Sequence, residues 1–202
     1  MPIVGIMRNI PSQHSEVIAG IYATSGLTNL EITMNSDNVA NTISQLIKTF
    51  GDRLNIGAGT VCTLEDLDKA LSAGAQFVVT PIINEEVIKT CVSASIPVFP
   101  GAYTPTEIYR AWSLGASMVK VFPATRLGVE YIKEVLAPLN QIKLLPTGGV
   151  TPDNFSDFLK AGAKGFGIGS HLFPKHIIEK EDWEGLRTLY TDFVNKYNQS
   201  LS

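Results

Sequence analysis

Short runs of β-forming residues recur along the whole chain at nearly even spacing, and helical patterns fill the intervals between them. Successive runs begin 20 to 27 residues apart, which leaves room for about ten helical residues and two short loops in each interval. Strands that alternate with helices in this way predict βαβ units and a parallel sheet. The eight runs are Ile3–Met7, Leu30–Met34, Asn55–Gly59, Phe77–Pro81, Val98–Gly101, Met118–Phe122, Lys143–Thr147 and Gly165–Gly169.

Glycines and threonines mark the ends of the expected helices. Gly74, Gly115 and Gly162 each follow a helical pattern and precede an alanine, and glycine readily adopts the left-handed conformation that ends a helix. Thr104-Pro105 and Thr151-Pro152 place a capping threonine before a proline, a pair that is typical of a helix start.

Eight such units predict an α/β fold, a single (β/α)8 TIM barrel that forms one domain over residues 1–202. The alternative is an open doubly wound sheet, which rarely needs eight near-equal units. The length is at the short end for a TIM barrel and leaves little room for insertions. The last helix, at about Asp182–Tyr197, is expected to complete the outer ring.

The composition excludes several other classes of protein. A net charge of −3 on 202 residues argues against a nucleic-acid partner. No apolar run reaches the roughly 18 residues of a membrane span, and the N-terminus has no signal-peptide pattern. Two cysteines, Cys62 and Cys91, make no disulfide framework, so we expect a cytoplasmic protein. His14, His171 and His176 do not have the spacing of metal ligands.

Side-chain alternation along two of the runs predicts opposite charges inside the barrel. Glu31 and Asn35 are expected to face inward from one run, and Lys120 and Phe122 from another. Charges inside a core are costly unless they are paired or needed. One interpretation is a structural ion pair. The other is a Schiff-base lysine with a carboxylate acid/base, because an apolar barrel disfavours the ammonium form and makes a neutral amine accessible.

Glycines also cluster at the ends of the last two expected strands. Gly148 and Gly149 come directly before the expected helix start at Thr151, and Gly169 precedes Ser170. Most isolated glycine pairs are turns. In TIM barrels, however, the loops after strands seven and eight often bind phosphate through backbone N–H groups. The position of these glycines therefore favours a phosphate site.

Two further side chains are expected at the rim where the strands end. Arg8 ends the first run, where a guanidinium is suited to an anion or to a rim salt bridge. Thr60 follows the third run, where its hydroxyl is suited to a substrate carboxylate or to a local capping role.

Several motifs occur together in one order and cover nearly the whole chain. They are Leu30-Glu31-Ile32-Thr33, Gly57-Ala58-Gly59-Thr60-Val61, Val79-Thr80-Pro81, Pro100-Gly101, Val119-Lys120-Val121-Phe122-Pro123-Ala124, Pro146-Thr147-Gly148-Gly149-Val150 and Ile168-Gly169-Ser170. On these motifs the chain resembles the class I 2-keto-3-deoxy-6-phosphogluconate (KDPG) aldolase family, which includes 4-hydroxy-2-oxoglutarate (KHG) and 6-phosphogalactonate aldolases.

This resemblance implies a mechanism, a site and an assembly. Lys120 would form a Schiff base with pyruvate, and Glu31 would act as general acid/base through water. The implied substrate-contacting residues are Thr60, Thr147, Phe122 and Pro81, and the implied phosphate-binding residues are Gly148, Gly149, Gly169 and Ser170. The family needs no cofactor and no metal, acts on a small phosphorylated keto-sugar acid and is usually a homotrimer.

The chain departs from the family pattern at three places. Asn35 and Arg8 are further implied substrate-binding residues. Asn35 stands where gluconate-type members commonly have a carboxylate-binding arginine, so that Arg8 becomes the expected cation. Met34-Asn35-Ser36 resembles the galactonate branch, whereas Thr147 resembles the gluconate branch. The chain also begins at its first strand, without the family's usual N-terminal helix.

The expected reaction is cleavage of KDPG to pyruvate and glyceraldehyde 3-phosphate. The galactonate epimer and KHG are the alternative substrates. A phosphate-binding barrel isomerase or synthase without a covalent intermediate is a more distant alternative, and a non-catalytic sugar-phosphate sensor is another.

Overall fold

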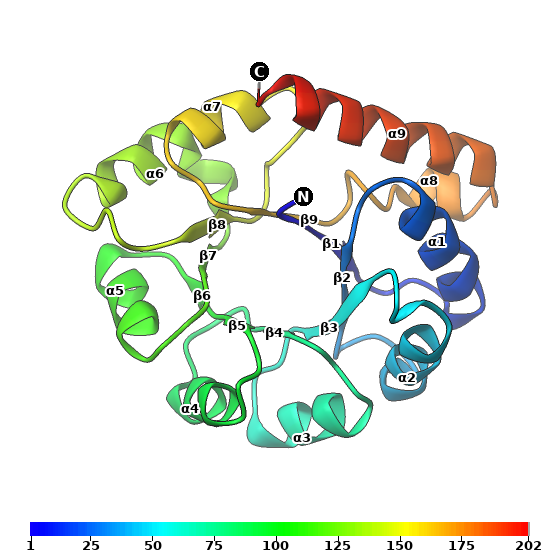
Figure 1. The fold of residues 1–202 in the computed structure, drawn as a ribbon, viewed down its shortest axis with the longest axis horizontal. Helices are drawn as coiled ribbons and strands as arrows, with labels where there is room; N and C mark the ends of the chain where they lie inside the picture. The colour runs from blue at the N-terminus through cyan, green and yellow to red at the C-terminus, as the bar shows by residue number, and fades with distance from the viewer. Residues whose placement is uncertain (202) are drawn as a thin grey trace.

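A computed structural model describes residues 1–201 of the chain as a ring of parallel strands surrounded by helices (Figure 1). The strands are β1 (Ile3–Met7), β2 (Asn29–Thr33), β3 (Asn55–Gly59), β4 (Val78–Val79), β5 (Val98–Phe99), β6 (Gly101–Ala102), β7 (Val119–Val121), β8 (Leu144–Pro146) and β9 (Phe166–Ile168). The helices are α1 (Ser12–Thr24), α2 (Val39–Phe50), α3 (Leu64–Ser72), α4 (Glu85–Ser93), α5 (Pro105–Ser113), the 3-10 helix η1 (Ala124–Arg126), α6 (Gly128–Leu136), α7 (Phe155–Lys160), α8 (Lys175–Ile178) and α9 (Trp183–Gln199).

The strands pair in two parallel groups that curl towards each other. One group has the order β5-β4-β3-β2-β1-β9, and the other has the order β6-β7-β8. Only Pro100 separates β5 from β6, so the chain leaves the first group and enters the second within one extended segment. At the other junction a single bridge joins Thr147 to Gly167. The result is a TIM-barrel-like α/β fold in which the carboxyl ends of the strands share one rim.

The helix-start and helix-end signals are confirmed at most positions. Gly74, Gly115 and Gly162 have φ values of 93°, 96° and 102°, as a left-handed end requires. Thr104 forms a capping box at the start of α5. The expected start at Thr151 is wrong, because α7 begins only at Phe155.

Two separate apolar clusters hold the fold together. The larger cluster fills the layer between strands and helices. The smaller one consists of Val4, Val79 and Leu145 from β1, β4 and β8, together with Phe77, which directly precedes β4. Phe99 and Met118 pack against the smaller cluster. Within residues 1–201, no helix is both long and apolar enough to cross a membrane.

Candidate active site

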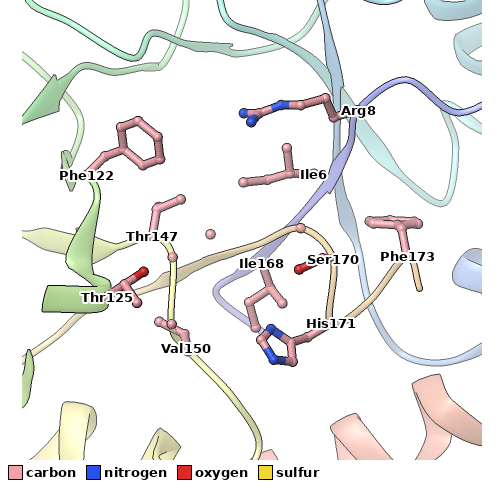
Figure 2. A pocket seen from close by; sticks show the side chains of 14 residues that line it. Ile6, Arg8, Phe122, Thr125, Thr147, Val150, Ile168, Ser170, His171 and Phe173 are labelled. Atoms are coloured by element: carbon pink, nitrogen blue, oxygen red, sulfur yellow. The ribbon is translucent and has the colours of Figure 1, made fainter. Parts of the chain in front are cut away.

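A cavity of about 550 Å³ opens where β1, β7, β8 and β9 end (Figure 2). Its walls therefore come from loops that are far apart in the sequence. The lining residues are Ile6, Arg8, Phe122, Thr125, Thr147, Gly148, Gly149, Val150, Gly167, Ile168, Gly169, Ser170, His171 and Phe173. A concave site at this rim is where barrel enzymes carry out their chemistry.

Glu31 and Lys120 are both buried, as the alternation along their strands predicts. Glu31 in β2 is 1% exposed, and Lys120 in β7 is 2% exposed. Gly59 in β3 leaves the space for the carboxylate, because a Cβ atom there would lie 1.7 Å from Glu31 Oε1. The Lys120 Nζ atom lies 5.0 Å from the centre of the Phe122 ring, a side chain that lines the cavity.

The structure does not show the two groups as a closed ion pair. No ion pair within 4.0 Å joins Glu31 to Lys120, and Glu31 Oε1 has no hydrogen-bond partner among residues 1–201. A buried polar atom without a partner is costly, and such atoms commonly mark a site whose partner is a ligand or a water molecule. The structural ion-pair interpretation therefore loses its main support.

Burial shifts the pKa of both groups towards their neutral forms. Burial raises the pKa of the Glu31 carboxyl, and the positive charges of Lys120 and Arg8 partly oppose this rise. Burial lowers the pKa of the Lys120 amine, Glu31 opposes the lowering and Arg8 adds to it. A lysine with a lowered pKa supplies more of the neutral, nucleophilic amine at neutral pH.

The loop after β8 forms the glycine-rich wall of the cavity. Gly148 and Gly149 have φ values of 90° and 75°, which side chains other than glycine rarely adopt. The 3-10 helix η1 packs directly against them, because a Cβ atom on Gly149 would lie 2.9 Å from the Thr125 Cα atom. The Ala124 N–H donates to the Thr147 carbonyl at 2.9 Å and so ties η1 to this loop.

We expect Gly149→Ala to damage this wall more than the same change elsewhere. The added methyl group would both strain the backbone and contact Thr125, at a cost of about 1–3 kcal/mol. Gly128→Ala is the matched control, because Gly128 has a φ of 71° and open space around its Cβ position. Chemical denaturation and the KM for a phosphorylated substrate measure the two effects. An equal loss of stability in both variants, with no change in KM, would contradict the contact with Thr125.

The cavity brings together most, but not all, of the predicted site residues. Arg8, Phe122 and Thr147 line it, together with all four residues predicted to bind phosphate. The two predicted catalytic residues are buried and are not among the lining residues. Thr60 and Pro81 are half-buried at the ends of β3 and β4 and are not among the lining residues. Their roles in binding stay predictions.

The strand alternation that predicts an inward-facing Asn35 does not extend as far as that residue. The strand β2 ends at Thr33, and the Ser36 N–H donates to the Thr33 carbonyl at 2.9 Å, which turns the chain. The alternation that places Glu31 inside therefore stops before Asn35, whose side chain is exposed. Asn35 is also absent from the lining of the cavity.

Sequence reasoning did not identify Thr125 and His171 as residues of this cavity. Thr125 follows the Phe122-Pro123-Ala124 motif, and that position after a strand is a signal that could have identified it. His171 directly follows Ser170, and that position beside a predicted phosphate-binding residue is the signal for it.

The barrel-like fold, the buried lysine and the glycine-rich cavity fit an aldolase, and comparison with known proteins shows this class. The family model for KDPG and KHG aldolase matches residues 1–189. The chain is 36% identical over 174 residues to a 2-dehydro-3-deoxy-6-phosphogalactonate aldolase of Escherichia coli, which covers 86% of this chain and 85% of that one. It is also 36% identical over 179 residues to a 2-dehydro-3-deoxy-phosphogluconate aldolase of Haemophilus influenzae, which covers 88% and 84%. The chain belongs to the KDPG and KHG aldolase family, and the protein is an aldehyde-lyase.

Solved structures agree with this membership. A native KDPGal structure superposes with a TM-score of 0.93 at 33% identity and covers 100% of this chain and 96% of its own. A KDPG aldolase from Legionella pneumophila, with pyruvate captured as a covalent carbinolamine intermediate, has a TM-score of 0.87 at 26% identity and covers 94% and 92%.

Proposed function

We propose that this protein is a class I aldolase that cleaves KDPG to pyruvate and glyceraldehyde 3-phosphate. One observation carries the proposal: Lys120 and Glu31 are buried without pairing to each other, near a cavity with a glycine-rich wall. Borohydride reduction in the presence of pyruvate tests it, since an imine on Lys120 becomes a stable adduct that peptide mass mapping locates. The covalent carbinolamine in the Legionella relative supports the same chemistry.

In this mechanism an iminium ion formed on Lys120 accepts the electron pair of the carbon–carbon bond that breaks. The neutral Lys120 amine attacks the substrate ketone, and loss of water gives an iminium ion. Cleavage of the C3–C4 bond moves its electron pair into the iminium, which becomes an enamine. Glu31, acting through water, takes the proton of the C4 hydroxyl and later assists protonation of the enamine. Hydrolysis then releases pyruvate and returns the free amine.

Two different parts of the cavity can bind the two anionic groups of the substrate, its carboxylate and its phosphate. The Arg8 guanidinium acts on the charges of both Glu31 and Lys120, so we assign it to the carboxylate of the keto acid. We assign the phosphate to Gly148, Gly149, Gly169 and Ser170, where the loops after β8 and β9 line the cavity. A phosphorylated keto-sugar acid carries both anions.

Thr147 is the residue that favours the gluconate epimer. It is 4% exposed and lines the cavity, and its hydroxyl makes only a long hydrogen bond of 3.4 Å to the Leu145 carbonyl. That hydroxyl is therefore available to a substrate hydroxyl. The galactonate epimer is the second candidate, because the native KDPGal structure has a TM-score of 0.93 against this chain.

We expect Thr147→Val to shift the preference between the two epimers. The change removes the hydroxyl but keeps the branched shape, so the kcat/KM ratio of gluconate to galactonate should fall about tenfold, the value of one good hydrogen bond. A coupled pyruvate assay on both phosphosugars measures the ratio. An unchanged ratio would remove Thr147 as the residue that distinguishes the epimers.

The strand arrangement supports one eight-unit barrel over residues 1–202 as a single domain. The segments β5 and β6 then count as one strand that changes partners at Pro100. The bridge between Thr147 and Gly167, with the Lys164 N–H donating to the Leu144 carbonyl at 2.9 Å, joins the ends of the ring.

We also expect a homotrimer. Leu64, Ile82 and Tyr103 are 45%, 51% and 42% exposed and lie in the segments that follow β3, β4 and β6, where a second copy would bury them. Light scattering on the eluting protein should give three times the 21.9 kDa chain mass. A mass of one chain would contradict this assembly.

A further inference from the structure

His171 lies in the wall of the cavity and is free to bind a ligand. It follows Ser170 in the loop after β9, and its side chain is exposed. Neither residue makes a hydrogen bond, an ion pair or a ring contact within residues 1–201. Figure 2 shows the imidazole below Ile168, at the side of the cavity away from Arg8.

The cavity has few positively charged side chains to neutralise an anion as highly charged as a phosphate monoester. A phosphate monoester carries about −1.5 to −2 at pH 7. The lining residues include no lysine and no carboxylate, and Arg8 and His171 are the only members that can become cationic. Backbone N–H groups and the Ser170 hydroxyl add hydrogen bonds but no formal charge.

Arg8 is placed to serve the other end of the substrate. It directly follows β1, whose pairing with β2 runs to Met7 and Ile32, so it lies next to the strand that carries Glu31. In Figure 2, Arg8 and His171 lie on opposite sides of the cavity, with Thr147 and Ser170 between them. The phosphate end is therefore left with His171 as its one titratable lining side chain.

We propose that His171 is a phosphate-binding residue whose imidazole donates a hydrogen bond to a phosphate oxygen and, when protonated, supplies positive charge. This makes it a specificity residue that distinguishes phosphorylated from unphosphorylated keto-sugar acids. The inference rests on the proposed aldolase function and adds a side chain to the phosphate site. It assigns no part of the bond cleavage to His171.

Kinetics on matched substrates test the proposal. KDPG and its unphosphorylated form, 2-keto-3-deoxygluconate, are compared in the wild type, His171→Ala, His171→Lys and His176→Gln. His176 is an exposed histidine in α8 outside the cavity lining and is the control. We expect His171→Ala to raise KM for KDPG about tenfold or more with little change in kcat, the effect of losing one hydrogen bond to a charged group. KM for the unphosphorylated sugar should not change.

His171→Lys tests whether a positive charge at this position is enough to bind phosphate, and His176→Gln is the control for losing a histidine elsewhere. His171→Lys should keep KM for KDPG near the wild-type value, since an ammonium group replaces the imidazole, and His176→Gln should match the wild type. A KDPG KM in His171→Ala equal to the wild-type value would overturn the proposal. An equal rise in KM for both sugars would also overturn it, because the residue would then not act on the phosphate.

Inorganic phosphate gives a readout that does not need turnover. Phosphate should raise the unfolding temperature of the wild type and have a much smaller effect on His171→Ala. If the wild type cleaves neither sugar but keeps this difference, the proposed function fails and the phosphate role of His171 stands. If the wild type cleaves KDPG and both proteins respond equally to phosphate, only the role of His171 fails.

Discussion

Replacing Lys120 with methionine should reduce cleavage by about 10⁴-fold or more, the usual size of the loss when a covalent nucleophile is removed. Methionine fills a similar volume, and the site is 2% exposed, so the fold should remain. Without the amine there is no imine and no electron sink for the broken carbon–carbon bond. Pyruvate release in a coupled assay measures the loss, and circular dichroism checks the fold.

Lys143→Met is the matched control for this variant. Lys143 is exposed and precedes β8, and its loss should change neither turnover nor borohydride trapping. In the wild type, the reduced pyruvyl adduct should map to Lys120 and be absent from Lys120→Met. Full activity in Lys120→Met, or an adduct on another lysine, would refute the assignment. Absence of any adduct in the folded wild type would favour a barrel enzyme without a covalent intermediate.

The Lys120→Met variant should also be more stable than the wild type at neutral pH. Burial lowers the pKa of Lys120 in the folded protein. The unfolded chain therefore binds the proton of the lysine more tightly, so that below about pH 10 this group lowers the free energy of unfolding. That destabilisation shrinks as the pH rises above the folded pKa and disappears above about 10.5, where both states are neutral. The difference in unfolding temperature should therefore shrink with rising pH.

Replacing Glu31 with glutamine should reduce turnover about 10²- to 10⁴-fold, the contribution typical of a general acid/base. The amide keeps the shape of the side chain but cannot take a proton from the C4 hydroxyl. Borohydride should still trap some pyruvate on Lys120, since attack by the amine needs no strong base. A wild-type rate in Glu31→Gln would remove the acid/base role, and Glu86→Gln, on an exposed position of α4, controls for the charge change.

The stability of Glu31→Gln should depend on pH in a defined direction. Burial raises the pKa of Glu31 in the folded protein, so the neutral form is favoured and ionisation above that pKa destabilises the fold. The stability linked to this proton is present below the unfolded pKa of about 4.3 and is lost as the pH rises through the folded pKa. Glu31→Gln should therefore unfold at a higher temperature than the wild type at pH 7, and the two should converge near pH 4.

Much of the fold and the reactive pair could be predicted from local patterns. Strand and helix periods, with glycine at helix ends, are properties of neighbouring residues, and they identified each extended segment. Alternation along β2 and β7 placed Glu31 and Lys120 inside because a strand turns successive side chains to opposite faces. The same rule failed at Asn35, where a turn replaces the strand and the alternation no longer applies.

Tertiary structure decided what lies together in the cavity. Thr125 and His171 are 46 positions apart in the chain, and no local period connects them. They share one wall because η1 packs on the glycine loop after β8 and the bridge between Thr147 and Gly167 brings the loop after β9 alongside. The change of partners at Pro100 likewise depends on how the two groups of strands pair. Short-range chemistry in the sequence thus specified the strands, the helices and the buried pair, whereas closure of the ring determined which loops meet around a substrate.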